Sequence, residues 1–573
     1  MKRRSALSTL PRWRFQAVVA GLIGLLGLVI WQLLSLQILD RERGSAFLKD
    51  QGAARSVRVA EIPAYRGVIS DRHGEPLAVS TPVMSIWADP QVLAGTARLS
   101  ELAAALGTST EALKEKLARY AGKRFMYLER HWMPAEARRV LDLGIAGVYS
   151  QREYKRFYPA GPVAAQLVGF TSRDGKGIEG VELAYDDWLK GTPGKKTYIK
   201  DRRGGVVRDI GVLEEARSGR DLRLSIDLRL QYQQHRELSR AVTALRAESG
   251  SVVTLDARTG EVLALVNYPD YNPNGNKGDA VHRRNRAVTD AYEPGSTMKA
   301  MTLVAALESG RYTPATTIDT APGWINVGGK VYEDPSNYKS IDLTRILQKS
   351  SQVGTTKLAL DLGHEPIRDV LSRFGIGEPL GTGFPGENAG RLPARDRWHV
   401  SEQVSLAFGY GFTASPLQLA AAYATFASGG VRLPVSMLQL QQAPEGRRVV
   451  DADIAKSVLQ MLHAVTLDDG TATRARVPGH KVGGKTGTVH KVGAEGYAKD
   501  RYVALFAGVA PVEEPRIASV VVINEPKGED YGGGAAAAPV FSAIVGGALH
   551  LLNVPPDATA IAESRAASVG GEA

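Results

Sequence analysis

The stretch Glu293-Pro294-Gly295-Ser296-Thr297-Met298-Lys299 runs directly into the apolar helical pattern of residues 300–307. Proline and glycine before such a pattern place Ser296 at or near the N-terminus of a helix. The i,i+3 spacing then puts Lys299 on the same face as Ser296. A serine hydroxyl becomes a nucleophile when a base takes its proton, and a lysine removed from solvent can serve as that base. The N–H groups of the helix N-terminus would stabilise a developing oxyanion.

Two later segments extend this pattern. Lys485-Thr486-Gly487-Thr488 follows Gly483-Gly484 and predicts a strand whose small residues let a substrate backbone lie alongside. Lys485 would hold a carboxylate, and the N–H of Thr488 would complete an oxyanion hole. Between the two lies Ser350-Ser351-Gln352, after a predicted helix at 343–349. A Ser-x-x-Lys pair alone is common on solvated helices, but the order Ser-x-x-Lys, Ser-x-amide, Lys-Thr-Gly is that of penicillin-recognising serine enzymes.

With these motifs the sequence resembles the class B penicillin-binding protein transpeptidases, above all the division-type group known as FtsI or penicillin-binding protein 3. The resemblance covers nearly the whole chain outside the C-terminal tail. Further segments similar to family signatures are Arg66–Gly74 with Leu77-Ala78, Gly177–Glu182, Tyr410-Gly411-Phe412, Pro416–Ala420 and Tyr531-Gly532-Gly533.

The resemblance implies roles for individual residues. Ser296 would be the acylated nucleophile, Lys299 its base, and Ser350 a proton relay to the leaving group. Substrate-binding residues would be Gln352, Lys485, Thr486, Gly487 and Thr488. Neither a cofactor nor a metal is expected.

The middle motif departs from the family pattern at Gln352. The family has Ser-x-Asn there, and no Ser-x-Asn occurs anywhere in this chain. Glutamine keeps the amide donor and acceptor but adds a methylene and a rotatable torsion. We expect acyl transfer to survive, while a specialised paralogue with weak or conditional activity stays open as an alternative to the principal septal enzyme.

Strand and helix patterns predict an α+β fold. Residues 221–227 alternate as in a strand before a helix, and 251–255 and 262–266 form a hairpin pattern. Helical stretches follow from 297 to about 371, and strand-like runs return at 502–507 and 517–523. Strands at both ends and helices between them suggest one antiparallel sheet, flanked by helices, with a helical insert.

The N-terminus predicts a membrane anchor. Five Lys or Arg residues and no acid occupy positions 1–16, and residues 17–36 are almost wholly apolar. Twenty such residues span about 30 Å as a helix, and the preceding positive charge holds the N-terminus in the cytoplasm. A cleaved signal peptide would have a shorter apolar region and a small-x-small site, which is absent here. No later segment is expected to span again.

These patterns divide the chain into five predicted parts. They are a cytoplasmic N-terminus at 1–16, a transmembrane anchor at 17–38, a mixed α/β pedestal (dimerisation) domain at 39–219, a transpeptidase domain at 220–553 and a disordered tail at 554–573.

The amino-acid composition excludes several classes of function. The 573 residues include no cysteine, which excludes a Cys nucleophile, Cys-ligated zinc and disulfides. The net charge of the whole chain is +11, and five of these charges lie in residues 1–16. The rest of the chain therefore carries 11 − 5 = +6. No stretch interleaves basic clusters with stacking aromatics, and the anchor argues against nucleic acid as a partner. The scattered histidines form no His-Glu-x-x-His motif.

Two local motifs have competing interpretations. Residues 479–486 match the phosphate-binding pattern G-x-x-x-x-G-K-[ST], but that loop needs an apolar strand before it and a helix after it. Neither is predicted here. Glu179 and Glu182 are spaced as an acid/base pair, but a structural contact is the favoured interpretation of two glutamates outside the catalytic unit.

By resemblance, the enzyme would be a septal peptidoglycan D,D-transpeptidase of the inner membrane, with its catalytic domain in the periplasm. It would act on D-Ala-D-Ala stem peptides, react with β-lactams, and bind an FtsW-type glycosyltransferase and other division proteins. A D,D-carboxypeptidase and a non-catalytic β-lactam-binding or divisome scaffold are the alternatives. A scaffold would tolerate loss of Ser296 or Lys299, and both are present.

Overall fold

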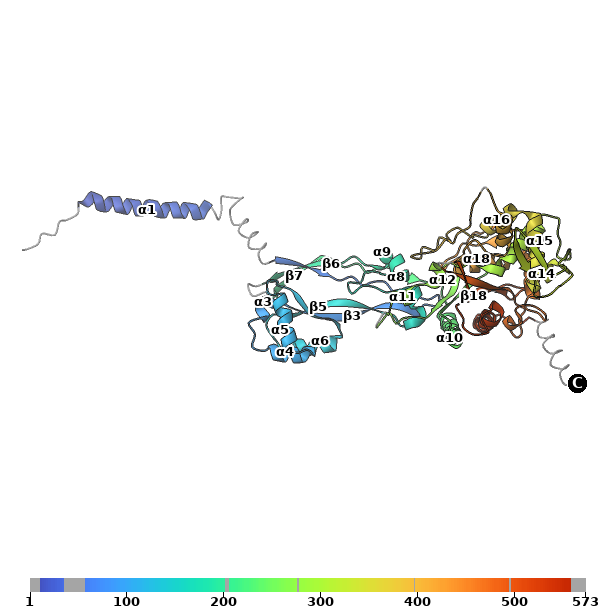
Figure 1. The fold of residues 1–573 in the computed structure, drawn as a ribbon. Coiled ribbons are helices and arrows are strands. Elements are labelled where there is room, and N and C mark those ends of the chain that lie inside the picture. Colours follow the sequence, from blue (N-terminus) through green and yellow to red (C-terminus); the bar gives the residue numbers. More distant parts are fainter. Residues whose placement is uncertain are drawn as a thin grey trace, which may run out of the picture. The chain divides into compact units, whose positions relative to one another are not determined.

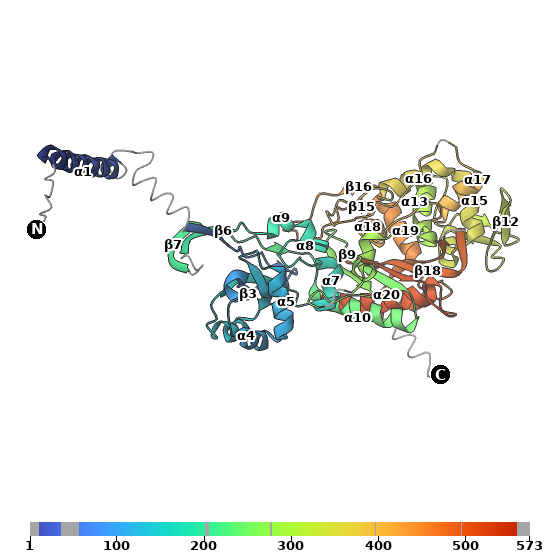
Figure 2. The same cartoon turned by 60° about the vertical axis from the view of Figure 1, so that its left-hand side comes forward.

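The computed structural model describes residues 11–35, 57–200, 206–275, 278–395, 397–493 and 496–557. It divides the chain into two compact units (Figures 1 and 2). Unit 1 comprises the residues up to Ala64 together with Pro82–Glu153 and Thr192–Arg217. Unit 2 comprises Tyr65–Thr81, Tyr154–Gly191 and the residues from Ser218 onward. The predicted domain boundaries remain predictions, and most of the predicted tail lies outside the described residues.

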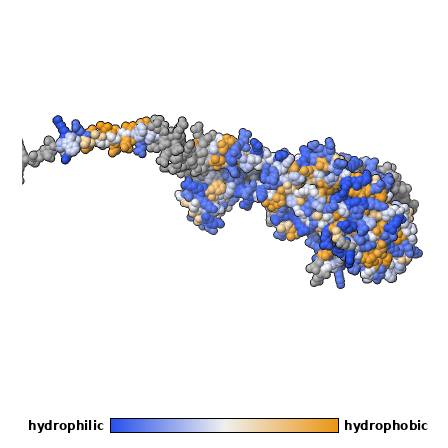
Figure 3. Space-filling view, turned by 90° about the horizontal axis from the view of Figure 1, so that it is seen from above, coloured by the Kyte–Doolittle hydropathy of each residue, from blue (hydrophilic) through white to orange (hydrophobic). Residues whose placement is uncertain are grey.

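The N-terminal helix α1 (Arg12–Leu34) has the length and composition of a membrane span, with a mean hydropathy of 2.4. Its apolar side chains are all exposed, and Figure 3 shows them as a nearly continuous hydrophobic band. Since apolar side chains left uncovered by protein suit a lipid environment, the helix agrees with the predicted anchor. Residues 36–38 of that prediction lie outside the described part of the chain.

A second segment, Gly533–Leu551, also meets the length and hydropathy requirements of a span, contrary to the sequence expectation. It consists of the π-turn η5 (Gly533–Ala537) and helix α20 (Ala538–Leu551). Half of it is buried, against strands of the unit 2 sheet and helix α10. Its hydrophobicity is therefore that of a core helix.

Unit 1 combines sheets with short helices. Strand β1 (Val57–Ile62) pairs antiparallel with β6 (Gly194–Lys200), and β6 pairs with β7 (Val206–Glu214). A small core lies beside β3 (Pro76–Ala88), β4 (Met126–Trp132) and β5 (Val148–Phe157), with helices α3 (Pro90–Leu93), α4 (Leu99–Leu106), α5 (Thr110–Arg119) and α6 (Pro134–Leu141). Helices α4 and α5 are separate, because Gly107 ends α4 with φ +69° and Ser109 caps α5.

Unit 2 is built on one antiparallel sheet of five strands in the order β10-β9-β19-β18-β17. These are β9 (Ser249–Asp256), β10 (Val262–Tyr268), β17 (Gly483–Gly493), β18 (Gly496–Ala510) and β19 (Ile517–Asn524). Strands β9 and β19 are fully buried, as expected of central strands covered on both faces. The predicted sheet built from both ends of the domain is confirmed.

Helices cover both faces of this sheet, as Figure 2 shows with β18 between the two layers. Helices α10 (Leu228–Ala244) and α20 pack on one face, and α18 (Pro416–Ala427) packs on the other. Helix α19 (Ala452–Ala464) packs on strand β17 beside α18. The other helices of the insert are α13 (Lys299–Glu308), α14 (Leu343–Lys349), α15 (Gln352–Leu362), α16 (His364–Arg373) and α17 (Val400–Ala407). The predicted α+β architecture with a helical insert is therefore confirmed.

The insert also contains short strands that helical periodicity did not predict. The hairpin β12 (Trp324–Val327)–β13 (Lys330–Glu333) turns at Gly328-Gly329, and β11 (Thr317–Asp319) pairs with β14 (Ser340–Asp342). Both turn glycines have positive φ, +58° and +83°, which lets a two-residue loop close the hairpin. The strand expected at 221–227 is reduced to β8 (Leu222–Arg223), after which Asp227 caps α10.

Candidate active site

Ser296 lies at the start of helix α13, in the 3₁₀ turn η3 (Gly295–Met298). Gly295 has φ +57°, and a Cβ there would come within 2.5 Å of Val489 on strand β17. A Cβ on Gly487 would lie 2.9 Å from the Pro294 carbonyl oxygen. The Ser-x-x-Lys turn and the Lys-Thr-Gly strand thus pack backbone to backbone, and glycine is required on both sides of the contact.

Lys299 is buried one helical turn beyond Ser296, with 2% of its surface exposed. Its Nζ donates to the Ser350 carbonyl oxygen at 2.6 Å, to Ser350 Oγ at 3.2 Å and to the Ser351 carbonyl oxygen at 3.2 Å. Burial lowers the pKa of Lys299 to about 7, although the nearby Asp334 carboxylate acts in the opposite direction. A large fraction of Lys299 is therefore neutral, and able to accept a proton, near neutral pH.

Ser350 occupies a strained turn between two helices. It ends α14 in the left-handed region (φ +57°, ψ +38°), a conformation uncommon for residues other than glycine. The next residue, Ser351, caps α15 by accepting from the Gly354 N–H. Ser351 Oγ also donates to Asp334 Oδ2 at 2.7 Å. Two helix ends and a buried carboxylate thus fix the orientation of Ser350.

Asp334 is the anchor of this turn and was not singled out from the sequence. Its carboxylate is 5% exposed and accepts from Ser351 Oγ and from the backbone N–H groups of Gln352 (2.5 Å) and Val353 (3.3 Å). It sits at the N-terminus of α15, where the helix dipole favours negative charge. A single acidic residue after a short strand carries no periodic signal, so only the tertiary structure identifies it.

Gln352 is the first residue of α15, and its exposed side chain lines the cavity beside Ser350. Within the described part of the chain, its amide group makes no side-chain hydrogen bond. The amide is therefore free to meet a ligand, but nothing in the protein holds its orientation.

Lys485 is completely buried on strand β17. Its Nζ donates to the carbonyl oxygen (3.1 Å) and the hydroxyl (3.2 Å) of Thr486. Burial and the proximity of Lys299 lower the pKa of Lys485 well below its ordinary value. Two buried lysines without a neutralising carboxylate between them make this a region that favours a bound anion.

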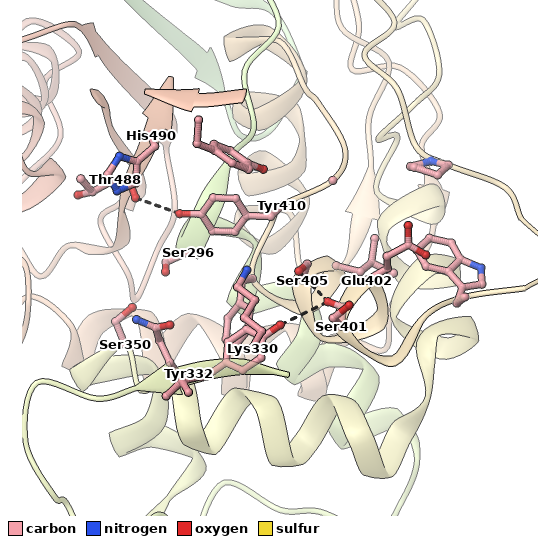
Figure 4. Close-up of a pocket in the computed structure, with 18 of the residues that line it drawn as sticks. Ser296, Lys330, Tyr332, Ser350, Ser401, Glu402, Ser405, Tyr410, Thr488 and His490 are labelled. Atoms are coloured by element: carbon pink, nitrogen blue, oxygen red, sulfur yellow. Dashed lines mark hydrogen bonds between the residues drawn. The ribbon is translucent and has the colours of Figure 1, made fainter. Parts of the chain in front are cut away.

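Thr488 faces the cavity from the same strand. Its hydroxyl oxygen accepts from the Gly533 N–H at 2.9 Å, and its carbonyl oxygen accepts from Tyr410 Oη at 3.4 Å (Figure 4). Because an acceptor position on the hydroxyl is already used, its proton is free to point toward a ligand. Strand β17 is the edge of the sheet, so its outward backbone groups are available to an extended peptide.

The cavity in front of Ser296 has a volume of about 580 Å³. It is lined by Ser296, Lys330, Val331, Tyr332, Ser350, Gln352, Pro393, Arg395, Trp398, Ser401, Glu402, Ser405, Leu406, Phe408, Tyr410, Gly411, Thr488, His490 and Tyr497. Four of the predicted site residues, Ser296, Ser350, Gln352 and Thr488, face it directly. The other four, Lys299, Lys485, Thr486 and Gly487, lie outside this lining, and Lys299 reaches it through its bonds to Ser350.

A rim of aromatic residues lies beside the Thr488 end of the cavity. Tyr497 Oη donates to both carboxylate oxygens of Glu293, at 3.0 and 2.9 Å, and the Gly411 N–H donates to the same carboxylate at 2.8 Å. Burial and the Glu293 charge raise the pKa of Tyr410 to about 12. The residues of this rim come from three segments that are far apart in the sequence. Sequence patterns therefore indicated only one of its residues, Tyr410, as part of a family motif.

The two competing local motifs are settled by the structure. Residues 483–493 form strand β17, and no helix follows Thr486, so the phosphate-loop interpretation is wrong. Glu182 is fully buried and paired with Arg66 (2.7 Å) and Arg156 (2.6 Å), which confirms its structural role. Among the described residues no group of three or more His, Asp or Glu side chains is arranged to hold a metal.

Comparisons with known proteins agree with this geometry. A family model described as the penicillin-binding protein transpeptidase domain matches residues 250–546, and one described as the penicillin-binding protein dimerisation domain matches residues 61–224. The probable peptidoglycan D,D-transpeptidase PbpC of Pseudomonas aeruginosa is 42% identical over 549 residues, covering 95% of this chain and 96% of the relative. The peptidoglycan D,D-transpeptidase FtsI of Escherichia coli is 41% identical over 568 residues, covering 97% and 95%.

A solved structure is similar over most of the chain. The crystal structure of penicillin-binding protein 3 from Mycobacterium tuberculosis, complexed with aztreonam, aligns with a TM-score of 0.68 and 29% identity over 87% of this chain and 98% of that one. Domain models, relatives and fold all agree with the serine–lysine site: the chain belongs to the class B penicillin-binding proteins and is a serine D,D-transpeptidase with a dimerisation domain and a transpeptidase domain.

Proposed function

We propose that this enzyme cross-links septal peptidoglycan during cell division, with Ser296 as its nucleophile. Ser296 Oγ would attack the carbonyl of the penultimate D-Ala of a stem peptide, form an ester and release the terminal D-Ala. An amine of a neighbouring stem would then take the acyl group. The observation that carries the proposal is the buried Lys299, whose pKa of about 7 suits a general base, one helical turn from Ser296.

Proton transfer in this mechanism runs through Lys299 and Ser350. Neutral Lys299 would take the Ser296 proton as the ester bond forms. Its existing bond to Ser350 Oγ, at 3.2 Å, provides a route for that proton to the departing amine of D-Ala. The N–H groups at the start of α13 and that of Thr488 would stabilise the oxyanion.

The anion-favouring region around Lys485 supports its proposed role in binding the terminal carboxylate. Thr486 and Thr488 would add hydroxyl donors, and Gly487 would let the peptide approach the edge of β17. Gln352 would hydrogen-bond to the peptide backbone from the opposite side of the cavity.

The same chemistry would make the protein a β-lactam target. Two crystal structures of penicillin-binding protein 3 from Mycobacterium tuberculosis are complexes with aztreonam and with ampicillin. A strained lactam carbonyl would acylate Ser296 as the D-Ala-D-Ala bond does.

The membrane arrangement is part of the proposal. Helix α1 would anchor the enzyme in the inner membrane, with residues 1–16 in the cytoplasm and the catalytic domain in the periplasm. An FtsW-type glycosyltransferase and other division proteins would be its partners there. FtsI among the relatives supports the division role.

A specialised paralogue is the second candidate, and Gln352 is the observation that favours it. The identity to PbpC, 42%, is within one percentage point of the 41% identity to FtsI, so identity alone does not separate the two roles. Depletion of the chain in its own cells separates them. Filamentation with a block in septation supports the division enzyme, and normal division supports the paralogue.

Covalent labelling with a fluorescent penicillin tests the nucleophile. The full-length protein should label, and Ser296→Ala should abolish labelling. Ser405→Ala is the matched control, since Ser405 lines the same cavity away from Lys299. Absence of labelling of the wild type at saturating dose would refute the catalytic proposal. Product analysis on a D-Ala-D-Ala peptide, with and without an amine, separates transfer from carboxypeptidase hydrolysis.

A further inference from the structure

The cavity continues beyond the acylation residues into a charged end. Figure 4 shows Ser401, Glu402 and Ser405 on the side of the cavity opposite Ser350 and Thr488. Lys330, Arg395 and Trp398 line this end with them. We name these six residues the distal end. None of them is needed to form the acyl-enzyme, since base, relay and carboxylate site all lie elsewhere.

Contacts between the hairpin β12–β13 and helix α17 hold the distal end together. Tyr332 Oη donates to the Ser401 carbonyl oxygen at 3.4 Å, and the Tyr332 ring stacks on Phe408 at 5.5 Å. A Cβ on Gly328 would touch Val400 at 3.0 Å, so the hairpin turn is pressed against the start of α17. Lys330, the first residue after this turn, is therefore presented to the cavity from a fixed backbone.

The distal end carries more positive than negative charge. Glu402 forms an ion pair with Arg395 and accepts from the His399 N–H at 3.1 Å, as part of the capping box of α17. These contacts keep the pKa of Glu402 below its ordinary value, so it stays ionised. The Lys330 ammonium lies over the Tyr332 ring, at 5.2 Å, and has no ion-pair partner in the described part of the chain. Two cations and one carboxylate leave a net charge of +1.

We propose that the distal end binds a free carboxylate of the acceptor amine's own residue, with Lys330 as its main counter-charge. This inference rests on the proposed transpeptidation. A transferase must hold a second substrate while the first is an ester on Ser296, and the donor's terminal carboxylate already has its site at Lys485. Trp398, whose indole stacks on His364 at 5.1 Å, adds apolar surface to the lining of this end.

The acyl-transfer step determines where the acceptor's amine must lie. Its uncharged amine nitrogen attacks the ester carbon, a C–N bond forms and the C–Oγ bond breaks. The proton lost by nitrogen returns to Ser296 Oγ by way of Lys299, which leaves the enzyme unchanged. A carboxylate held at Lys330 would fix the attacking amine within the cavity and so raise its effective concentration.

Paired acceptors test the proposal on the full-length enzyme with a D-Ala-D-Ala donor. D-Methionine carries the free carboxylate, and D-methioninamide lacks it. The Lys330→Gln variant should lose about three- to tenfold in transfer to D-methionine, as expected for a partly exposed charge pair, and about twofold or less in transfer to the amide. Comparing variant with wild type for each acceptor cancels the different basicities of the two amines. Lys339→Gln, an exposed lysine outside the cavity lining, is the control.

Three results would overturn the proposal. The first is equal loss with both acceptors, and the second is no loss with either. The third is slower acceptor-free release of D-Ala only from donors with a free side-chain carboxylate, which would assign the distal end to the donor. Absence of both penicillin labelling and D-Ala release from the wild type would instead refute the proposed function itself, and the inference with it.

Discussion

Two clusters of buried charge in unit 2 differ in how that charge is balanced. Glu182 is fully buried, with Arg66 bound to one carboxylate oxygen and Arg156 to the other, and Arg66 also pairs with Asp186 at 2.6 Å, so that two carboxylates balance two guanidinium groups. Lys299 and Lys485 are as deeply buried, but their partners are carbonyl and hydroxyl oxygens. Desolvation lowers the pKa of both lysines. Buried charges that are paired with opposite charges stabilise a fold. Buried lysines whose partners are uncharged oxygens are suited to act as a base or to bind an anion.

The largest expected effect follows from replacing the base. Lys299→Met should lower the rate of penicillin acylation about 10²- to 10⁴-fold, because the Ser296 proton then has no acceptor. The variant should unfold within about 5 °C of the wild type, because the loss of the Nζ hydrogen bonds to Ser350 and Ser351 is offset by removal of a buried, partly charged amine. Stopped-flow acylation and calorimetry measure the two quantities. A large loss of stability would show that Lys299 is mainly structural.

The opposite pattern is expected at the balanced cluster. Glu182→Gln leaves Arg156 buried without a counter-charge and Arg66 paired with Asp186 alone, which should cost about 3–5 kcal/mol of stability. The fraction that remains folded should acylate at the wild-type rate. Denaturant unfolding and active-site titration with labelled penicillin test this. An acylation rate per folded molecule well below that of the wild type would link this cluster to catalysis.

Asp334 is a buried carboxylate that both holds the Ser350 turn in place and acts on the pKa of Lys299. Its replacement is therefore expected to have an intermediate effect on stability and on acylation. Asp334→Asn weakens the bonds to Ser351 Oγ and to the Gln352 N–H, which should cost about 1–3 kcal/mol of stability. It should also slow acylation, because the Ser350 turn loses its anchor. Unfolding and acylation are measured on the same preparation. Ser351→Ala is the companion variant, since it removes only one of the bonds.

The pH dependence of acylation tests the lowered pKa of Lys299. If the neutral lysine is the base, as proposed, the rate should reach a plateau above pH of about 7 and fall about tenfold for each unit below it. In Asp334→Asn the carboxylate that raises the pKa of Lys299 is gone, so the midpoint should move to lower pH. A profile that stays flat from pH 5 to 9 would contradict this role for Lys299.

The sequence predicted those parts of the site that depend on local order. Ser296, Lys299 and Lys485 lie in motifs whose helix and strand settings follow from glycine, proline and periodicity, and the sheet follows from the alternation in its strands. The sequence did not indicate the roles of Asp334 and Glu293, because each contacts a residue far away in the sequence, Ser351 and Tyr497 respectively. It did not indicate Lys330 either, because only the folded chain places this residue at the cavity. Such contacts arise from tertiary packing, which has no period along the chain.

Gln352→Asn is expected to have the smallest effect, and it bears on whether the enzyme is a specialised one. The Gln352 amide has no partner among the described side chains, so its extra torsion is free before substrate binds. Ordering one more torsion costs a fraction of the roughly 1.5–2 kcal/mol that burial of a whole glutamine side chain costs. Asparagine in its place should therefore raise the acylation rate by about two- to fivefold while leaving the plateau of the pH profile in position. Unchanged kinetics with both penicillin and peptide would show that the longer amide reaches the substrate equally well. A fall in rate would show that the cavity is adapted to glutamine, which is the result expected of a specialised paralogue.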